Sequence, residues 1–323
     1  MTPPNTTLSQ APQPPRKVRI GLGLSAFPFE SARAYFRWID LLEDRGVDSV
    51  WQTDRLISEQ PFLEAMSAMA AIAGRTERIK FGMNAVVASF RDPLVLANQC
   101  ATVDFLSGGR LLPVFGVGAA RAPELRRTQL EAAGRGRRVD EMLTLMQRLW
   151  SEEQVDFEGE FFRYHNVTIA PRPVQKRLPC WIGGHSAAAI GRTARHGTGW
   201  LAGLRTPEQI EPIVERIHAA VAAEGTQIAH DHYGAGFPFY FGDWDARIER
   251  RAAASKALAT DGFDPRRYFA VGDADTIVER CEQYVAAGVF KLVLMPIAQG
   301  DAELMQQTRR LIDEVIPRVE REI

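Results

Sequence analysis

Two glycines, a histidine and a serine stand in a row at residues 183–186, between a short apolar run and an alanine-rich stretch of helical character. Glycine lets a backbone approach a ligand closely, and the first turn of a helix offers N–H groups with a partial positive charge. This combination suits a phosphate group. A tight turn with Ser186 as a helix N-cap is the alternative interpretation. His185 is the best placed of the six histidines for proton transfer.

Asp54 and Arg55 come directly after a second apolar run, at residues 49–53. A carboxylate or a guanidinium at the end of a strand can take part in catalysis. The alternative is structural, because the same two residues can form a buried ion pair or a capping pair. The spacing leaves both interpretations open for Asp54 and Arg55.

A glycine-containing string at residues 116–121 follows a third apolar run. Gly116 and Gly118 match the first half of a dinucleotide-binding fingerprint, but Arg121 stands where the third glycine would be, so support for a Rossmann site is weak. The chain has no GxSxG elbow of a hydrolase. It also has no histidine pair or carboxylate cluster with metal-ligand spacing, so we predict no metal site.

Composition excludes several classes of partner. The chain has 323 residues with 39 Lys and Arg against 40 Asp and Glu, which gives a net charge of −1. A nucleic-acid-binding surface would add a basic excess, so no nucleic-acid partner is expected. No apolar run approaches the roughly 18 residues of a membrane span and no signal-peptide pattern is present, so no membrane partner is expected either. Three separated cysteines are typical of a reducing compartment, and we expect a cytoplasmic protein.

Short apolar runs alternate with segments of helical periodicity along most of the chain. Alternating strands and helices require parallel pairing, and eight such units can close into a barrel. We predict an α/β fold, a (β/α)8 TIM barrel with insertions, and an open doubly wound sheet is the alternative. The predicted strands lie at residues 18–24, 49–53, 79–85, 111–117, 180–183, 199–202, 233–241 and 290–295.

The barrel is expected to be a single domain over residues 17–323. Residues 1–16 contain five of the 19 prolines and are interpreted as a flexible N-terminal arm. Residues 151–178 and 243–267 do not fit the repeat and are interpreted as insertions. We expect them at the carboxyl ends of the strands, where barrel sites are built and where the polar residues above would form one pocket.

Four longer strings resemble the bacterial luciferase-like monooxygenase family, and the resemblance covers nearly the whole chain from Val18 to Pro317. Shorter marks agree, such as FEGEFF at residues 157–162. The resemblance implies a (β/α)8 barrel that binds a flavin at the carboxyl ends of its strands, either FMN or the deazaflavin coenzyme F420. The four strings are SVWQTDRL (49–56), RIKFGMNAVVASFRDP (78–93), ATVDFLSGGRLLPVFGVG (101–118) and LPCWIGGHSAAAIGRTARHGTGWL (178–201).

The resemblance also implies which residues hold the cofactor. The turn made by Gly183, Gly184, His185 and Ser186 would hold its phosphate. Luciferases have a phosphate-binding arginine where this chain has an alanine, and the nearby Arg121 could replace it.

The same resemblance places other residues beside the ring system. Asp54 matches an acidic residue that lies near the ring, and Gly116 and Gly118 match the end of the fourth strand beside the cofactor. Asn84 and Ala85 fall where the family often has a non-proline cis peptide against the ring face.

The leading hypothesis for function is a flavin-dependent oxidoreductase of the monooxygenase type. Reduced FMN from a separate flavin reductase would react with oxygen, and the protein would direct oxygenation of a small organic substrate. Asp54 and His185 are the candidates for proton handling, and Arg55 is a third candidate catalytic residue.

Two alternatives share the same barrel. An F420-dependent dehydrogenase or reductase would transfer hydride without oxygen, although Arg55 stands where many deazaflavin-dependent relatives have a histidine. A flavin-binding protein without turnover is the other. The resemblance also implies a homodimer.

Overall fold

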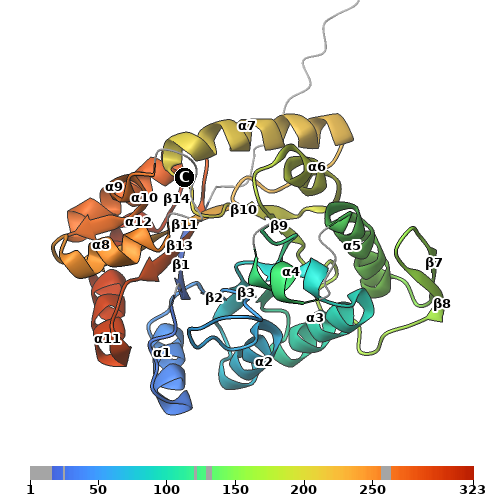
Figure 1. Ribbon diagram of the computed structural model, residues 1–323, viewed down its shortest axis with the longest axis horizontal. Coiled ribbons are helices and arrows are strands. Elements are labelled where there is room, and N and C mark those ends of the chain that lie inside the picture. Colours follow the sequence, from blue (N-terminus) through green and yellow to red (C-terminus); the bar gives the residue numbers. More distant parts are fainter. Residues whose placement is uncertain (1–16, 25, 120–121, 129–132, 256–262) are drawn as a thin grey trace, which may run out of the picture.

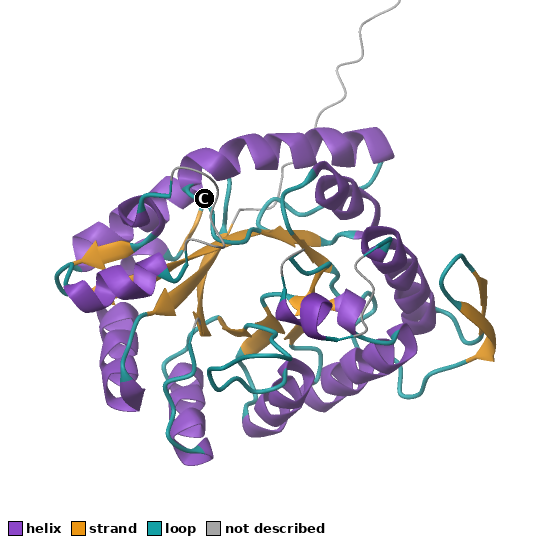
Figure 2. Cartoon of the chain, in the orientation of Figure 1, coloured by secondary structure: helices purple, strands orange, loops and turns teal. Residues whose placement is uncertain are grey.

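The structure is a computed structural model that describes residues 17–24, 26–119, 122–128, 133–255 and 263–323. Residues 1–16, the expected arm, and Arg121, a candidate phosphate ligand, lie outside the described residues. The described chain curls a mostly parallel sheet into a barrel, with strands at the centre and helices around them (Figure 1 and Figure 2). The predicted fold class is confirmed.

Eight strand positions form the ring, and each overlaps one of the predicted strands. Neighbours in the ring run parallel, and β13 returns to pair with β1. Six positions are single strands: β1 (Lys17–Leu24), β2 (Ser49–Gln52), β9 (Trp181–Gly183), β10 (Gly199–Leu201), β11 (Tyr233–Phe241) and β13 (Lys291–Pro296). The other two are split, β3 (Lys80–Met83) from β4 (Val86–Val87) and β5 (Leu111–Leu112) from β6 (Val114–Gly116).

The ring closes through the two split positions. β3 pairs with β5 and β4 pairs with β6, so the third and fourth positions are joined on both sides of their breaks. Pro113 stands at the break between β5 and β6, where a proline has no N–H to donate to a neighbouring strand. Two short strands extend the sheet: β12 (Ala270–Gly272) pairs with β11, and β14 (Arg321–Glu322) runs antiparallel to β1.

Helices cover the outside of the ring, and several begin at the polar residue that caps them. Ser31 accepts from the N–H of Ala34 at the start of α1, and Asp92 accepts from two N–H groups at the start of α3. No helix among the described residues combines the length and apolar character needed to cross a membrane. The longer helices are α1 (Ala32–Asp44), α2 (Ala65–Arg75), α3 (Pro93–Ser107), α5 (Arg135–Ser151), α6 (Ala187–His196), α7 (Pro207–Glu224), α10 (Ala274–Ala286) and α11 (Gly300–Arg310). The shorter ones are α4 (Pro123–Arg127), α8 (Ala246–Ala253), α9 (Pro265–Tyr268) and α12 (Ile316–Val319).

Large apolar side chains fill the inside of the ring. Trp51, Val114, Trp181, Leu201 and Val293 form one buried cluster there. A filled barrel has no room for a ligand along its axis, so a site must lie above this cluster, where the strands end.

The first insertion does not lie where we expected. It follows α5 and contains the hairpin of β7 (Val155–Glu158) and β8 (Arg163–Val167), which Figure 1 shows outside the ring. Gln175, near its end, donates a hydrogen bond to the carbonyl of Leu111, the first residue of β5. The insertion therefore returns at the amino ends of the strands, because it follows a helix and not a strand. The second insertion follows β11 and contains α8.

Charged side chains at the amino ends of the strands bind the chain itself. Lys291, the first residue of β13, makes a buried ion pair with Asp48, which precedes β2. Arg110, which precedes β5, donates to four backbone carbonyls and to the hydroxyl of Thr76.

Glu43 organises the same end from the last turn of α1. Its carboxylate accepts hydrogen bonds from three successive N–H groups, at residues 77–79, just before β3. Burial raises the pKa of Glu43, but the three N–H donors outweigh burial and lower it below its usual value.

Candidate functional site

Three strand ends meet at Ala85. The peptide bond between Asn84 and Ala85 is cis, as the resemblance implies, and it lies in the break between β3 and β4. A Cβ at Gly116, the end of β6, would lie 3.6 Å from the Ala85 methyl group, and a Cβ at Gly183, the end of β9, would lie 3.5 Å from it. Glycine at both positions leaves the backbone bare beside Ala85. The structure thus brings together four of the predicted cofactor residues.

Gly118 belongs to the same group through the segment after the cis bond. Its φ is +80°, and a Cβ there would lie 2.7 Å from Cγ1 of Val87 and 3.4 Å from Cζ of Phe90. A residue with a side chain would need both an unusual backbone conformation and a displaced neighbour. The segment after β6 is therefore packed directly against β4.

Asp54 is held by Arg91 and not by Arg55. Arg91 donates to both carboxylate oxygens of Asp54, at 2.6 and 2.9 Å, and the N–H of Val87 donates to Asp54 Oδ2 at 2.9 Å. The Asp54 side chain is 1% exposed. Arg91 also donates to Glu64 at 2.9 Å. This bidentate pair ties the end of β2 to β4, the strand that follows the cis bond.

The two carboxylates stabilise the positive charge of Arg91. Burial lowers the pKa of Arg91, but the hydrogen bonds and charges of Asp54 and Glu64 raise it by more. Asp54 thus forms a buried ion pair, but with Arg91 and not with Arg55, so the pairing that we considered from the sequence is wrong. Arg55 is exposed and stacks over the ring of Phe62, with 5.1 Å from Cζ to the ring centroid. Catalytic roles for Asp54 and Arg55 stay predictions.

The turn at residues 183–186 leads from β9 directly into α6. Gly184 has φ +113°, and its carbonyl accepts a hydrogen bond from Trp200 Nε1 at 2.7 Å. Ser186 is the N-cap of α6 and accepts from the N–H of Ala189 at 3.2 Å. Ser186 and the first two residues of α6 are exposed, so the first turn of the helix faces solvent. The cap and an open anion-binding turn are compatible, because the cap uses only one of the first N–H groups.

The imidazole ring of His185 contacts the guanidinium group of Arg205. Arg205 Nη2 lies 2.8 Å from His185 Nε2 and 3.2 Å from Nδ1. A guanidinium can only donate, so the imidazole accepts and is neutral. Burial and then the charge of Arg205 lower the pKa of His185. Arg205 itself is buried, and its carbonyl accepts from the hydroxyl of Tyr284 at 2.5 Å.

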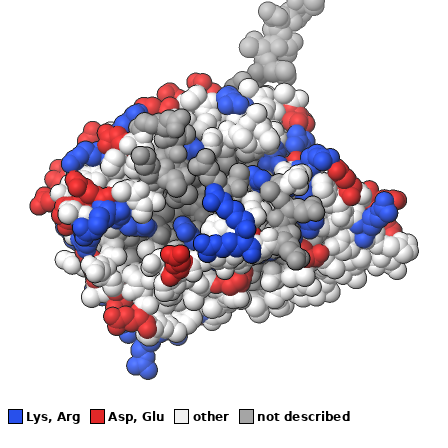
Figure 3. Space-filling view, in the orientation of Figure 1, with Lys and Arg blue, Asp and Glu red and all other residues white. Residues whose placement is uncertain are grey.

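Basic side chains gather in the middle of the face shown in Figure 3. Arg251 of α8 is half-buried, and burial followed by the charge of Arg55 lowers its pKa. The positive charge of Arg55 therefore acts on Arg251 at this face. A positive potential at the strand ends attracts anionic ligands.

Sequence reasoning missed three residues of this site. Arg91, Glu64 and Arg205 hold Asp54 and His185, but each sits in a loop or at a helix end with no spacing that marks it. Among the residues that the structure describes, no group of three or more His, Cys, Asp or Glu side chains could hold a metal ion.

The family pattern described as luciferase-like monooxygenase matches residues 10–262. The chain belongs to this family. Among solved structures, monooxygenase RslO1 from Streptomyces bottropensis is similar, with a TM-score of 0.81, 23% identity and coverage of 93% of this chain and 99% of that one. An F420-dependent secondary alcohol dehydrogenase in complex with an F420-acetone adduct is also similar, with a TM-score of 0.77, 16% identity and coverage of 93% and 98%. Both likenesses concern the fold.

Curated relatives of this luciferase-like chain carry a more specific name. An F420-dependent glucose-6-phosphate dehydrogenase of Intrasporangium calvum is 34% identical over 174 residues, which is 49% of this chain and 50% of the relative. The chain thus spans about half the length of that relative. A protein of the same name from Microbacterium testaceum is 28% identical over 316 residues, 86% of this chain and 91% of the relative.

Proposed function

We propose that this luciferase-like protein is an oxidoreductase that binds a phosphate-bearing flavin-type cofactor at the strand ends, and that this cofactor is coenzyme F420. The observation that carries the proposal is the meeting of Ala85, Gly116 and Gly183 directly beside the turn at residues 183–186. A bare backbone surface next to a helix N-terminus fits a flat ring whose side chain ends in a phosphate.

The residues present fit such a group. A Cβ at Gly184 would lie 3.2 Å from Cβ of Ala189, so a side chain at this position would fill the cradle at the start of α6. When bound, the deazaflavin would supply hydride transfer. The chain would hold its phosphate on the turn at residues 183–186 and its ring face against Ala85.

The remaining polar residues take positioning and proton-handling roles in this proposal. The carboxylate of Asp54 is occupied by Arg91 and Val87, so Asp54 positions the segment that carries Ala85. His185 is neutral and exposed. A substrate hydroxyl group that replaces Arg205 as its hydrogen-bond partner would give its proton to that ring nitrogen. The substrate class is a small organic molecule.

The choice of F420 rests on the relatives and on charge. The curated relatives above are named F420-dependent, one of them over most of both chains. Coenzyme F420 carries carboxylates on a glutamate tail beyond its phosphate, whereas FMN ends at its phosphate. The positive charges of Arg55 and Arg251 at the same face suit the longer anion.

A monooxygenase that uses reduced FMN and oxygen is the second candidate. The observation that favours it is Arg55, because the resemblance places a histidine there in many deazaflavin-dependent relatives. In this candidate a separate flavin reductase would supply the reduced cofactor.

Titration of the purified protein with F420 and FMN, followed by cofactor fluorescence, tests the proposal. We expect F420 to bind at least about tenfold more tightly than FMN and to be reduced when a substrate alcohol is oxidised. Tighter FMN binding with oxygen uptake in the presence of reduced FMN would establish the monooxygenase instead. Tight binding of either cofactor without turnover of any substrate would indicate a flavin-binding protein.

We also infer that a second copy of this chain covers the outer face of α2 and α3. The two helices carry almost no exposed charge. Within α2 and α3 the charged residues are Arg75, at the end of α2, and Asp104, which is fully buried. The segment between the helices contains five more: Glu77, Arg78, Lys80, Arg91 and Asp92. Val95, Phe105 and Leu106 of α3 are each more than half exposed. An uncharged face can meet a copy of itself about a two-fold axis without repulsion.

The oligomeric state tests this surface. Val95→Asp would place two like charges at a two-fold interface, and we expect a monomer by sedimentation velocity where the wild type is a dimer. A wild-type monomer, or a variant that remains a dimer, would contradict this assignment.

A further inference from the structure

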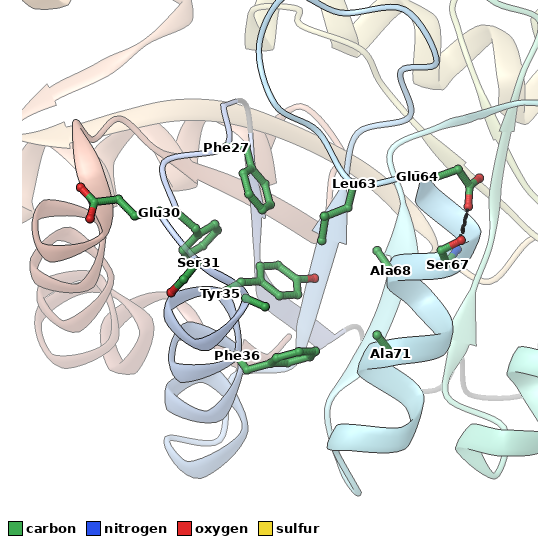
Figure 4. A pocket seen from close by; sticks show the side chains of 12 residues that line it. Phe27, Glu30, Ser31, Tyr35, Phe36, Leu63, Glu64, Ser67, Ala68 and Ala71 are labelled. Atoms are coloured by element: carbon green, nitrogen blue, oxygen red, sulfur yellow. Dashed lines mark hydrogen bonds between the residues drawn. The ribbon is translucent and has the colours of Figure 1, made fainter.

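A cavity of about 450 Å³ lies between α1 and α2, on the outside of the strand ring. Figure 4 shows its walls: the loop after β1 and the first turns of α1 on one side, and Leu63 with α2 on the other. The volume lies within the range of small-molecule sites, about 300–1,000 Å³. It is separate from the glycine turn at residues 183–186, which contributes no lining residue.

One wall of the cavity is a rigid aromatic cluster. Tyr35 lies 6.0 Å from Phe27, 5.3 Å from Phe29 and 5.4 Å from Phe36 between ring centroids. The facing wall on α2 is made of small side chains, Ala68 and Ala71 among them. Aromatic rings that pack on one another keep their positions, and alanines opposite them leave the space between the helices unfilled.

Tyr35 brings a single polar atom into this apolar space. The residue is 2% exposed, and Figure 4 shows its hydroxyl group pointing from α1 across the cavity toward α2. Within the described part of the chain, that hydroxyl group makes no hydrogen bond. Burial raises the pKa of Tyr35, so the hydroxyl stays protonated and can donate as well as accept. The hydroxyl group faces the open space between the two helices, so a ligand in that space can hydrogen-bond to it.

The rim of the cavity offers no positive side chain to an anion. Its two charged lining residues are Glu30, which is exposed, and Glu64, whose side chain is 40% exposed. Glu64 also fixes the α2 wall, because it caps that helix at Ser67 and accepts from Arg91. The backbone carbonyl of Leu63 accepts from Gln52 at 2.8 Å. The cavity therefore has a preformed wall and a rim without a positive side chain.

We infer that this cavity is a second ligand site, which takes a neutral, mainly apolar molecule with one hydroxyl or carbonyl group that hydrogen-bonds to Tyr35. The rings supply apolar contact, the tyrosine hydroxyl fixes orientation, and the lining has no positive side chain that would bind a phosphate or a carboxylate. The inference does not depend on which cofactor binds at the strand ends.

Two isosteric probes test the site, 2-naphthol and 2-methylnaphthalene, with binding followed by naphthyl fluorescence of the full chain. Wild type is expected to bind 2-naphthol about tenfold more tightly than 2-methylnaphthalene. Tyr35→Phe should remove this preference without a loss of thermal stability, since the hydroxyl group it deletes has no partner. A preference that survives in Tyr35→Phe, or is absent in wild type, would overturn the inference.

Variants that obstruct either the cavity or the strand-end site show which of the two binds the probes. Ala68→Leu extends a side chain into the cavity and should weaken both probes at least about tenfold, whereas Ala219→Leu, an exposed position on α7, should leave both unchanged. If Ala68→Leu fails to fold, Ala71→Leu on the same wall replaces it. Gly184→Val, which obstructs the strand-end site, should keep probe binding. Loss of binding in Gly184→Val with retention in Ala68→Leu would place the probe at the strand ends and refute the second site.

Discussion

The two ends of the barrel use charge in different ways. At the amino ends, Lys291 binds Asp48, Arg110 binds backbone carbonyls, and Glu43 binds backbone N–H groups, so the charges there hold the chain together. At the carboxyl ends, Asp54 and Arg91 form such a buried pair. His185 and Arg55 stay exposed.

The difference separates stability from ligand binding. Polar groups that are fully bonded within the chain stabilise the fold, because breaking them leaves buried groups without partners. Bare backbone at Gly116, Gly183 and Gly184 adds little to packing and leaves room for a ligand. Variants at the amino ends should therefore lower the stability of the fold, and variants at the carboxyl ends should weaken cofactor binding.

The largest expected effect is at the amino end. Below about pH 7, where Lys291 is charged, Asp48→Asn leaves it buried without its carboxylate and should lower the free energy of unfolding by about 3–5 kcal/mol. Denaturant unfolding measures this loss. Cofactor affinity of the folded variant should stay that of wild type, and a loss of affinity matching the loss of stability would contradict the separation.

The same variant has a defined pH dependence. Burial lowers the pKa of Lys291 to about 7, whereas an unfolded lysine has a pKa of about 10.4. Between these values the unfolded state binds more protons, so stability should rise as pH increases from about 7 to about 10. Removal of the Asp48 carboxylate should lower the pKa of Lys291 further and extend that rise to lower pH. A profile identical to that of the wild type would contradict the assignment.

At the carboxyl end, Gly184→Val should weaken cofactor binding about a hundredfold, or about 2.8 kcal/mol. The valine would have to adopt φ +113° and would meet Cβ of Ala189 at 3.2 Å, in the space assigned to the phosphate. The matched control is Gly203→Ala, since no atom lies within 4 Å of a Cβ at Gly203. Equal affinity of the two variants would refute the phosphate site.

Arg91→Lys should weaken cofactor binding about tenfold, or about 1.4 kcal/mol. Lysine keeps the charge but cannot bond both oxygens of Asp54, so the segment after the cis bond loses its anchor. Arg148→Lys is the control, because Arg148 makes a similar two-oxygen pair with Glu152 on the outer helix α5. If both variants bind cofactor alike, Arg91 has no positioning role.

The smallest expected effect is at Glu43. Glu43→Gln keeps one acceptor oxygen for the N–H groups at residues 77–79 and should lower stability by about 1 kcal/mol, with no change in cofactor affinity. The lowered pKa of Glu43 means that its contribution is present above the unfolded pKa of about 4.3 and is lost as pH falls below that value. The two proteins should therefore converge in stability in acid, as measured by denaturant unfolding.

Local sequence patterns predicted the elements well and side-chain partners poorly. Apolar runs bounded by glycine, proline and capping residues located all eight strand positions, since such patterns are local. Helix α2 was not singled out, because its start after Glu64 lacks the aspartate and proline that mark the start of α3. The cis bond at Asn84 followed from the family resemblance and from nothing in the residues alone.

Partner choice depends on contacts between distant segments. Asp54 was predicted beside Arg55 because they adjoin in sequence, yet the fold brings Arg91 to it from 37 positions away. Arg205 reaches His185 across 20 positions. No spacing rule connects such residues, so the site could be located from sequence but its hydrogen-bond network could not.

The short antiparallel contact between β1 and β14 has a practical consequence for handling the protein. Lys17 pairs in register with Glu322, so the start of the described barrel and its last strand lie side by side at the amino ends of the strands. A short linker could join these two points in a circular permutant. A surface attached through residue 322 would hold the barrel with its glycine-lined mouth turned outward, free to exchange ligands with solution.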